Sequence, residues 1–253
     1  MVNINMRINN KNVIIDTISG IVSGFCVAPF VTIIDKSITK NASGTSTLFR
    51  SINTDIFKNL RTPIKFCKGL PFLCIWGLYS ATYTTANYID SYCKKHNINS
   101  DVPKFIGVGS VNASLSILKD RSFARMFGTC LPTKIPLITY GLWTVRDMST
   151  IVTSFNVPSK LADVLEKKGY SKKVSMNSAQ VFCPVVMQTI TTPLHLLGLD
   201  YYNNRGKMMN ERFKFIRKEY GKTTFARMCR IAPAFGFGGI INNNLKNYLY
   251  NNF

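Results

Sequence analysis

The stretch Phe225-Ala226-Arg227-Met228-Cys229-Arg230-Ile231-Ala232-Pro233 opens the last long uncharged segment of the chain. Its first four residues occur once more, at 123–126, where they again open such a segment and a proline again follows the arginine. A looser copy at 66–69 is followed by Pro71 and opens a third segment. Units that recur in this way are typical of an internally repeated fold, so the three openings predict a triplicated chain.

The distribution of charge separates two explanations of a basic chain. Of the 253 residues, 46% are hydrophobic and 17% are charged, and the formal net charge is +20. A nucleic-acid-binding protein would carry its basic residues on one face of a soluble fold. Here the lysines and arginines gather between long uncharged segments, which is the pattern of a membrane protein. We therefore expect a lipid bilayer, and no nucleic acid, as a partner.

Side chains that carry enzyme chemistry are few. The seven cysteines include no CxxC pair and mostly lie in apolar segments, as buried free thiols do. The two histidines, His96 and His195, have no metal-ligand spacing. The chain has no nucleophile elbow, no glycine-rich phosphate loop and no pair of carboxylates placed for acid–base chemistry. The sequence therefore predicts that the protein is not an enzyme and holds no metal or cofactor.

Six segments are free of charge or nearly so. Each is close to the roughly 20 residues that a membrane-spanning helix needs, although the third and sixth are short. All six contain polar side chains, which in a bilayer belong against other helices or a wet cavity. We predict an all-α membrane protein with six transmembrane helices and a polar interior, and a soluble all-α bundle is the alternative. The segments are residues 17–34, 69–89, 105–118, 126–145, 174–199 and 231–245.

The connections on the two sides of such a bundle differ in charge. Those after the first, third and fifth segments hold 19 lysines and arginines, and the remaining ends and loops hold 12. Positive loops face the negative side of a membrane, so both termini are expected on the other side. Residues 54–65 and 210–220 mix apolar and basic side chains, as interfacial helices do, with a solvated surface helix as the alternative. A further short helix is predicted at 158–168.

Several short motifs resemble those of the mitochondrial carrier family. Lys68-Gly69 is similar to the family's R-G, and Glu219-Tyr220-Gly221 with the following 227–233 is similar to its E-G…R-I-A-P run. The resemblance implies one domain, 1–253, with a pseudo-threefold bundle built from repeats at about 12–95, 102–155 and 174–253, the middle one shortened. It also implies the mitochondrial inner membrane, with both termini on the intermembrane-space side and cardiolipin as a lipid partner.

The same resemblance implies that the gates of the family have been lost. In that family, acids and bases at fixed positions after a proline form a salt-bridge ring. The matching positions here hold mostly apolar or neutral side chains: Val31, Ile34, Leu118, Arg121, His195 and Gly198. Alternating access needs two gates of similar stability. We therefore expect a transport-inactive accessory subunit of a respiratory-chain assembly, with other subunits of that inner-membrane complex as partners.

A divergent transporter is the second hypothesis. Positions that hold substrate in the carrier family correspond here to Trp76, Thr133, Lys134 and Arg230. Lys134 is the one charge inside its segment, and an intramembrane cation is by default a functional candidate. Together with Arg230 it could hold an anion. This hypothesis predicts exchange of a small anionic metabolite across the inner mitochondrial membrane.

Overall fold

The fold is all-α. The computed structural model describes residues 10–129 and 134–252, and every regular element within them is helical, which confirms the predicted class. The elements are α1 (Asn10–Ala42), α2 (Leu48–Arg61), α3 (Pro63–Cys67), α4 (Leu70–His96), α5 (Asp101–Phe127), α6 (Leu137–Lys167), α7 (Lys172–Asn203), α8 (Met209–Ile231), the π-helical η1 (Ala232–Phe237) and α9 (Gly238–Asn252).

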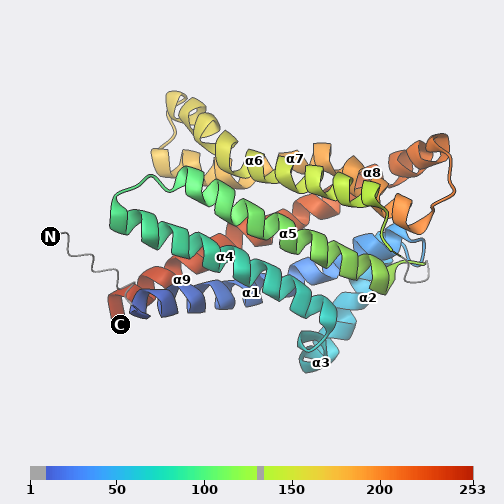
Figure 1. The fold of residues 1–253 in the computed structure, drawn as a ribbon, viewed down its shortest axis with the longest axis horizontal. Coiled ribbons are helices and arrows are strands. Elements are labelled where there is room, and N and C mark those ends of the chain that lie inside the picture. The colour runs from blue at the N-terminus through green and yellow to red at the C-terminus, as the bar shows by residue number, and fades with distance from the viewer. Residues whose placement is uncertain (1–9, 130–133, 253) are drawn as a thin grey trace.

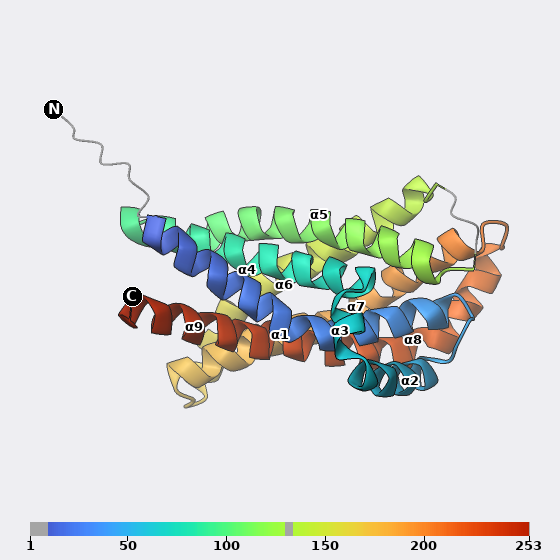
Figure 2. The same ribbon diagram turned by 90° about the horizontal axis from the view of Figure 1, so that it is seen from below.

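Six long rods run back and forth along one direction (Figure 1). Five are single helices, α1, α4, α5, α6 and α7, and the sixth is the continuous run of α8, η1 and α9. Each rod packs against the next, and the sixth packs against the first, so the rods close into a ring. Figure 2 shows the bundle from below, with α2 at the end away from both termini.

The bounds of α4 follow from its sequence. Pro71 lies in the first turn, where the missing N–H of proline breaks no intrahelical hydrogen bond. The last turn holds Lys94 and Lys95, whose positive charges suit the negative end of the helix dipole. Asn97 then adopts a left-handed conformation with φ of 52°, which ends the helix. Three local signals thus define a rod of 27 residues.

Two glycines let α1 and α4 pack in direct contact. A Cβ at Gly20 would lie 2.7 Å from the backbone nitrogen of Thr84, and one at Gly24 would lie 2.6 Å from that of Ser80. Real Cβ atoms essentially never approach other heavy atoms so closely. Small residues at such positions allow helix backbones to meet, as in many membrane bundles. These glycines therefore fix the spacing of the first two rods.

The bundle exposes large apolar side chains and buries several charged ones beside its apolar core. Large apolar side chains such as Phe30 and Phe182 are exposed along the rods, whereas Asp35, Arg146 and Arg227 are buried between them. Charged side chains are almost never fully buried in soluble proteins unless they are paired, and in membrane proteins they face the bundle interior. Within the described residues, two stretches, Lys11–Ala42 and Val174–Asn203, are long and apolar enough to cross a membrane. The six spans and the threefold repeat stay predictions.

The sixth rod changes geometry at η1, which contains Pro233. Proline has no N–H and cannot continue the α-helical hydrogen-bond ladder. The hydroxyl of Tyr83 on α4 donates to the Ala234 carbonyl, which satisfies a backbone acceptor in this segment. Short π-helical segments are frequent at functional sites. This one directly follows Arg227 and Arg230 of the opening stretch.

The helices predicted in the connections form with different bounds. Residues 54–65 fall on the end of α2 and the start of α3, and residues 210–220 form the first half of α8. The separate helix predicted at 158–168 is instead the continuation of α6. Lys134 also differs from its predicted place. Because α6 begins at Leu137, Lys134 lies exposed in the connection before the rod.

Candidate functional site

Asp35 on α1 binds cations from two other rods inside the ring. Its Oδ2 lies 2.7 Å from Nζ of Lys119 on α5, and its Oδ1 lies 2.9 Å from Nη1 of Arg230 on α8. Asp35 and Lys119 are buried, and the Arg230 side chain is 16% exposed. A buried carboxylate is costly unless it is paired and hydrogen-bonded. Asp35 therefore requires both partners, and it ties α1 to α5 and α8.

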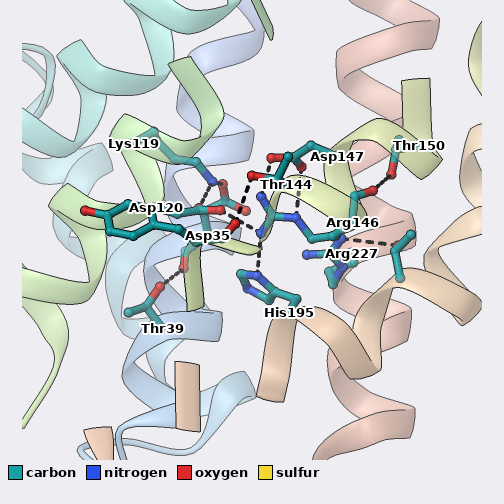
Figure 3. A network of polar contacts seen from close by, with 12 residues as sticks. Asp35, Thr39, Lys119, Asp120, Thr144, Arg146, Asp147, Thr150, His195 and Arg227 are labelled. Carbon is teal, nitrogen blue, oxygen red and sulfur yellow. Dashed lines mark hydrogen bonds and ion pairs between the residues drawn. The ribbon is translucent and has the colours of Figure 1, made fainter. Parts of the chain in front are cut away.

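Arg146 on α6 is the second centre of charge (Figure 3). Its Nη1 forms a 2.6 Å ion pair with Asp120 Oδ2, and its Nη2 and Nε donate to Asp147 at 2.7 and 2.9 Å. Nη1 also lies 2.6 Å from Nδ1 of His195 on α7. Because a guanidinium only donates, His195 Nδ1 must accept, which leaves the proton of the neutral ring on Nε2. Asp120 also pairs with Lys119, which joins the two centres.

Arg227 on α8 is buried differently from the other cations. Its Nη2 donates to Gln188 Oε1 at 2.8 Å and to Thr191 Oγ1 at 3.5 Å, both on α7. Its Nε has no hydrogen-bond partner within the described part of the chain, although the side chain is only 2% exposed. Within the same residues it forms no ion pair shorter than 4.0 Å with a carboxylate. A neutral amide and a neutral hydroxyl thus hold a charged group.

We call these residues the charged layer: Asp35, Lys119, Asp120, Arg146, Asp147, His195, Arg227 and Arg230. A cavity of about 40 Å³ lies beside it in the middle of the ring. Its wall includes Asp35, Asp147, Lys119, Arg227 and Arg230, with neutral side chains from α4, α5 and α6. Both signs of charge therefore line one interior space.

A second polar group lies nearer the termini. Lys246 on α9 pairs with Asp16 on α1 at 3.1 Å, and Ser91 on α4 donates to Asp16 at 2.6 Å. Asn87 and Asn242 exchange side-chain hydrogen bonds of 2.9 and 2.8 Å. We call these residues, with Tyr250, the terminal layer. Asp16 and Asp35 are about 28 Å apart along α1, because an α-helix rises about 1.5 Å per residue.

The structure separates the residues predicted to hold substrate. Arg230 lines the cavity, but Lys134 and Trp76 do not. The indole of Trp76 instead donates to the Ile21 carbonyl at 3.0 Å, between α1 and α4. Thr133 lies outside the described residues. Of the predicted pair Lys134 and Arg230, the structure thus brings only Arg230 to the interior.

The predicted gate positions lie beside the ion pairs rather than in them. Val31 and Ile34 pack in apolar clusters, and Leu118 is 53% exposed. Arg121 is partly exposed and forms no ion pair within the described residues. Gly198 packs against Trp143, where a Cβ would lie 2.5 Å from the indole nitrogen. His195 is the member of this set that joins the charged layer.

Ion pairs nevertheless form next to the positions at which the resemblance implied a lost gate. Asp35 directly follows Ile34, and Lys119 and Asp120 directly follow Leu118. Successive residues of an α-helix differ by about 100° around its axis, so a shift of one position moves a side chain from the outer face to the inner one. A fixed spacing counted from a proline missed these groups, and a search for charges that directly flank the uncharged segments would have found them.

Residues 19–250 match the family model described as a probable citrulline exporter. The chain belongs to this family. The whole charged layer lies within the matched residues. No curated protein and no solved structure matches the chain.

Membership of the exporter family corrects two predictions. The assignment to the mitochondrial carriers is wrong, because the family model that matches is that of the exporters. The short arginine, glycine and proline motifs that carried the resemblance also suit helix ends and helix packing in general. The predicted accessory subunit is wrong as well, because an exporter is a transporter. An exporter acts in a membrane, which agrees with the predicted membrane class.

Several finer predictions have no support in the family match. These are the mitochondrial inner membrane, the respiratory chain and cardiolipin. The absence of enzymatic activity, of a cofactor and of nucleic-acid binding also stays a prediction. What the match supports is transport across a membrane, which is the coarser part of the second hypothesis from the sequence.

Proposed function

We propose that this protein is a membrane transporter that exports citrulline through the centre of the ring. The family match supports both the substrate and the direction. The observation that carries the proposal is the cavity in the middle of the ring, whose wall includes carboxylates and cations. A wall of both signs suits a zwitterionic amino acid better than a simple anion. The substrate proposed here thus differs from the small anionic metabolite expected from the sequence.

Citrulline offers three different groups to such a site. Its carboxylate suits an arginine, which binds carboxylates through charge-assisted N–H donors. Its ammonium suits an aspartate such as Asp35 or Asp147 at the wall. Its uncharged ureido group needs neutral donors and acceptors, and Asn112 and Ser116 on α5 supply them. All three kinds of partner lie around one cavity.

Transport requires a wider state of the ring. The cavity of about 40 Å³ is far below the roughly 300 Å³ at which ligand pockets usually begin. The charged layer would have to part toward one side of the membrane and the terminal layer toward the other. A ligand that binds a wider state better shifts the population toward it. We propose that all six rods cross the membrane, with both termini on one side and the basic connections facing the negative side.

Efflux from proteoliposomes tests the proposal. Vesicles containing the purified full chain are loaded with radiolabelled citrulline and diluted into citrulline-free buffer. We expect efflux above that of protein-free vesicles, and little efflux of glutamate or phosphate, both of which carry a net negative charge at neutral pH. Efflux of glutamate or phosphate without that of citrulline would contradict the proposal and favour the small-anion hypothesis.

A further inference from the structure

The charged layer holds one more positive charge than its carboxylates balance. Asp35, Asp120 and Asp147 supply three negative charges, and their ion pairs engage Lys119, Arg146 and Arg230. These three cations and three carboxylates neutralise one another, and His195 accepts a hydrogen bond as a neutral ring. Arg227 remains as the cation without a carboxylate among the described residues. The surplus charge therefore belongs to one identifiable side chain.

The surroundings of Arg227 leave part of its donor surface unused. One nitrogen, Nη2, is held by Gln188 and Thr191, and Nε has no partner among the described residues. The side chain is buried and forms part of the cavity wall. A buried charge without a counter-ion is costly, and natural proteins usually pair or neutralise it. An arrangement of this kind is expected where the counter-ion arrives with a ligand.

Arg230 is less suited than Arg227 to bind a negative charge that a ligand brings. Its Nη1 lies 2.9 Å from both oxygens of Asp35, so its charge is already balanced. A substrate carboxylate at Arg230 would compete with Asp35, whereas one at Arg227 would displace no carboxylate. Gln188 holds the Arg227 guanidinium from α7 and limits its rotation, because a planar guanidinium bound at one nitrogen presents its other donors in a fixed direction.

We propose that Arg227 is the receptor for the α-carboxylate of the transported amino acid, and that Gln188 positions it. This inference rests on the proposed transport of citrulline and names the residue that selects amino acids over amines. The ligand class is an α-amino carboxylate whose side chain is uncharged. Binding places the missing negative charge of the layer beside its surplus cation. An amine that lacks the carboxylate gains no such partner.

The test compares three labelled substrates in proteoliposomes: citrulline, its desamino analogue and its decarboxylated analogue. The first two keep the carboxylate and the third lacks it. In Arg227→Met we expect KM for citrulline and for the desamino analogue to rise roughly 10- to 100-fold, as the loss of a charge-assisted hydrogen bond predicts. KM for the decarboxylated analogue should stay unchanged. Arg227→Lys should restore part of the loss, because it keeps the charge without the planar donors.

Arg217→Met is the matched control. Arg217 lies on the same helix and is exposed, so its removal deletes one cation outside the cavity. It should leave all three KM values unchanged. Equal losses for all three substrates in Arg227→Met, or an unchanged KM for citrulline, would overturn the inference.

Ligand-induced thermal stabilisation separates this inference from the proposed function. The probes are citrulline, glycine and N-carbamoylputrescine, which is the decarboxylated analogue, added to the detergent-solubilised full chain. We expect citrulline and glycine, the two probes that carry a carboxylate, to raise the melting temperature of the wild type but not that of Arg227→Met. If the wild type exports no citrulline yet shows this pattern, the proposed function fails and the carboxylate receptor stands. If the wild type exports citrulline and both proteins respond alike, the receptor assignment fails alone.

Discussion

The charged layer and the terminal layer both lie between the rods of the ring, but they are built in different ways. The charged layer joins α1, α5, α6, α7 and α8 through side chains that are mostly ionised. The terminal layer joins α1, α4 and α9 through one ion pair set among amides and hydroxyls. Replacing buried ion pairs by apolar groups is often neutral or stabilising. The richer network is therefore explained better by binding than by stability.

The largest loss of stability is expected from Arg146→Met, which removes the cation between the buried carboxylate of Asp120 and the partly buried one of Asp147. Asp120 and Asp147 then lose their shared partner, and breaking a buried pair by removing one side costs about 3–5 kcal/mol. The free energy of unfolding in mixed micelles measures this loss. The double variant Arg146→Met with Asp147→Asn should recover part of it. If Arg146→Met unfolds with the same free energy as the wild type, the charged layer does not stabilise the ring.

A smaller effect is expected from Gly24→Val, which acts between the two layers. The added side chain meets the backbone of Ser80, and overpacking of this kind costs about 1–3 kcal/mol. The melting temperature of the detergent-solubilised protein should fall. Gly77→Val on α4, where a Cβ meets nothing within 4 Å, is the matched control. Equal effects at the two glycines would contradict the close approach of α1 and α4.

Asp16→Asn tests the terminal layer. It should lower the free energy of unfolding by less than Arg146→Met does in the charged layer. Lys246 loses its ion pair, but its side chain is 15% exposed and can still contact water. The new amide can still accept a hydrogen bond from Ser91. We expect a loss of about 1 kcal/mol, typical of one hydrogen bond. Unfolding in mixed micelles again gives the value. A loss as large as that of Arg146→Met would abolish the contrast between the layers.

The smallest effect is expected at a position first interpreted as a gate. Leu118 is 53% exposed, and Leu118→Met conserves its volume, so stability should change by less than about 1 kcal/mol. Citrulline efflux should also be unchanged. Lys119→Met, one residue further, removes one of the two cations paired with Asp35 and should abolish efflux. A loss of efflux in Lys119→Met but not in Leu118→Met would show that the ion pairs, and not the predicted gate position one residue earlier, are needed for transport.

The sequence predicted the rods better than it predicted the site. Uncharged segments with charged ends indicated a helical bundle with a polar interior, and Arg230 was identified as a candidate at its centre. Lys119, Asp120 and Arg146 were missed, because each lies at or beside the end of an uncharged segment, where charges normally mark the membrane boundary. The family match corrected the assignment that short motifs had suggested.

The pattern of charge along the chain by itself determined the all-α class, because long segments without charge and with suitable helix ends have few alternatives to helical rods. Only the tertiary structure decided which charges meet. Asp35 and Arg230 are far apart in the sequence and come together because the sixth rod closes the ring against the first. The rotation of each helix about its axis decides whether Leu118 or Lys119 faces the interior, and that rotation is fixed by packing between rods rather than by local sequence.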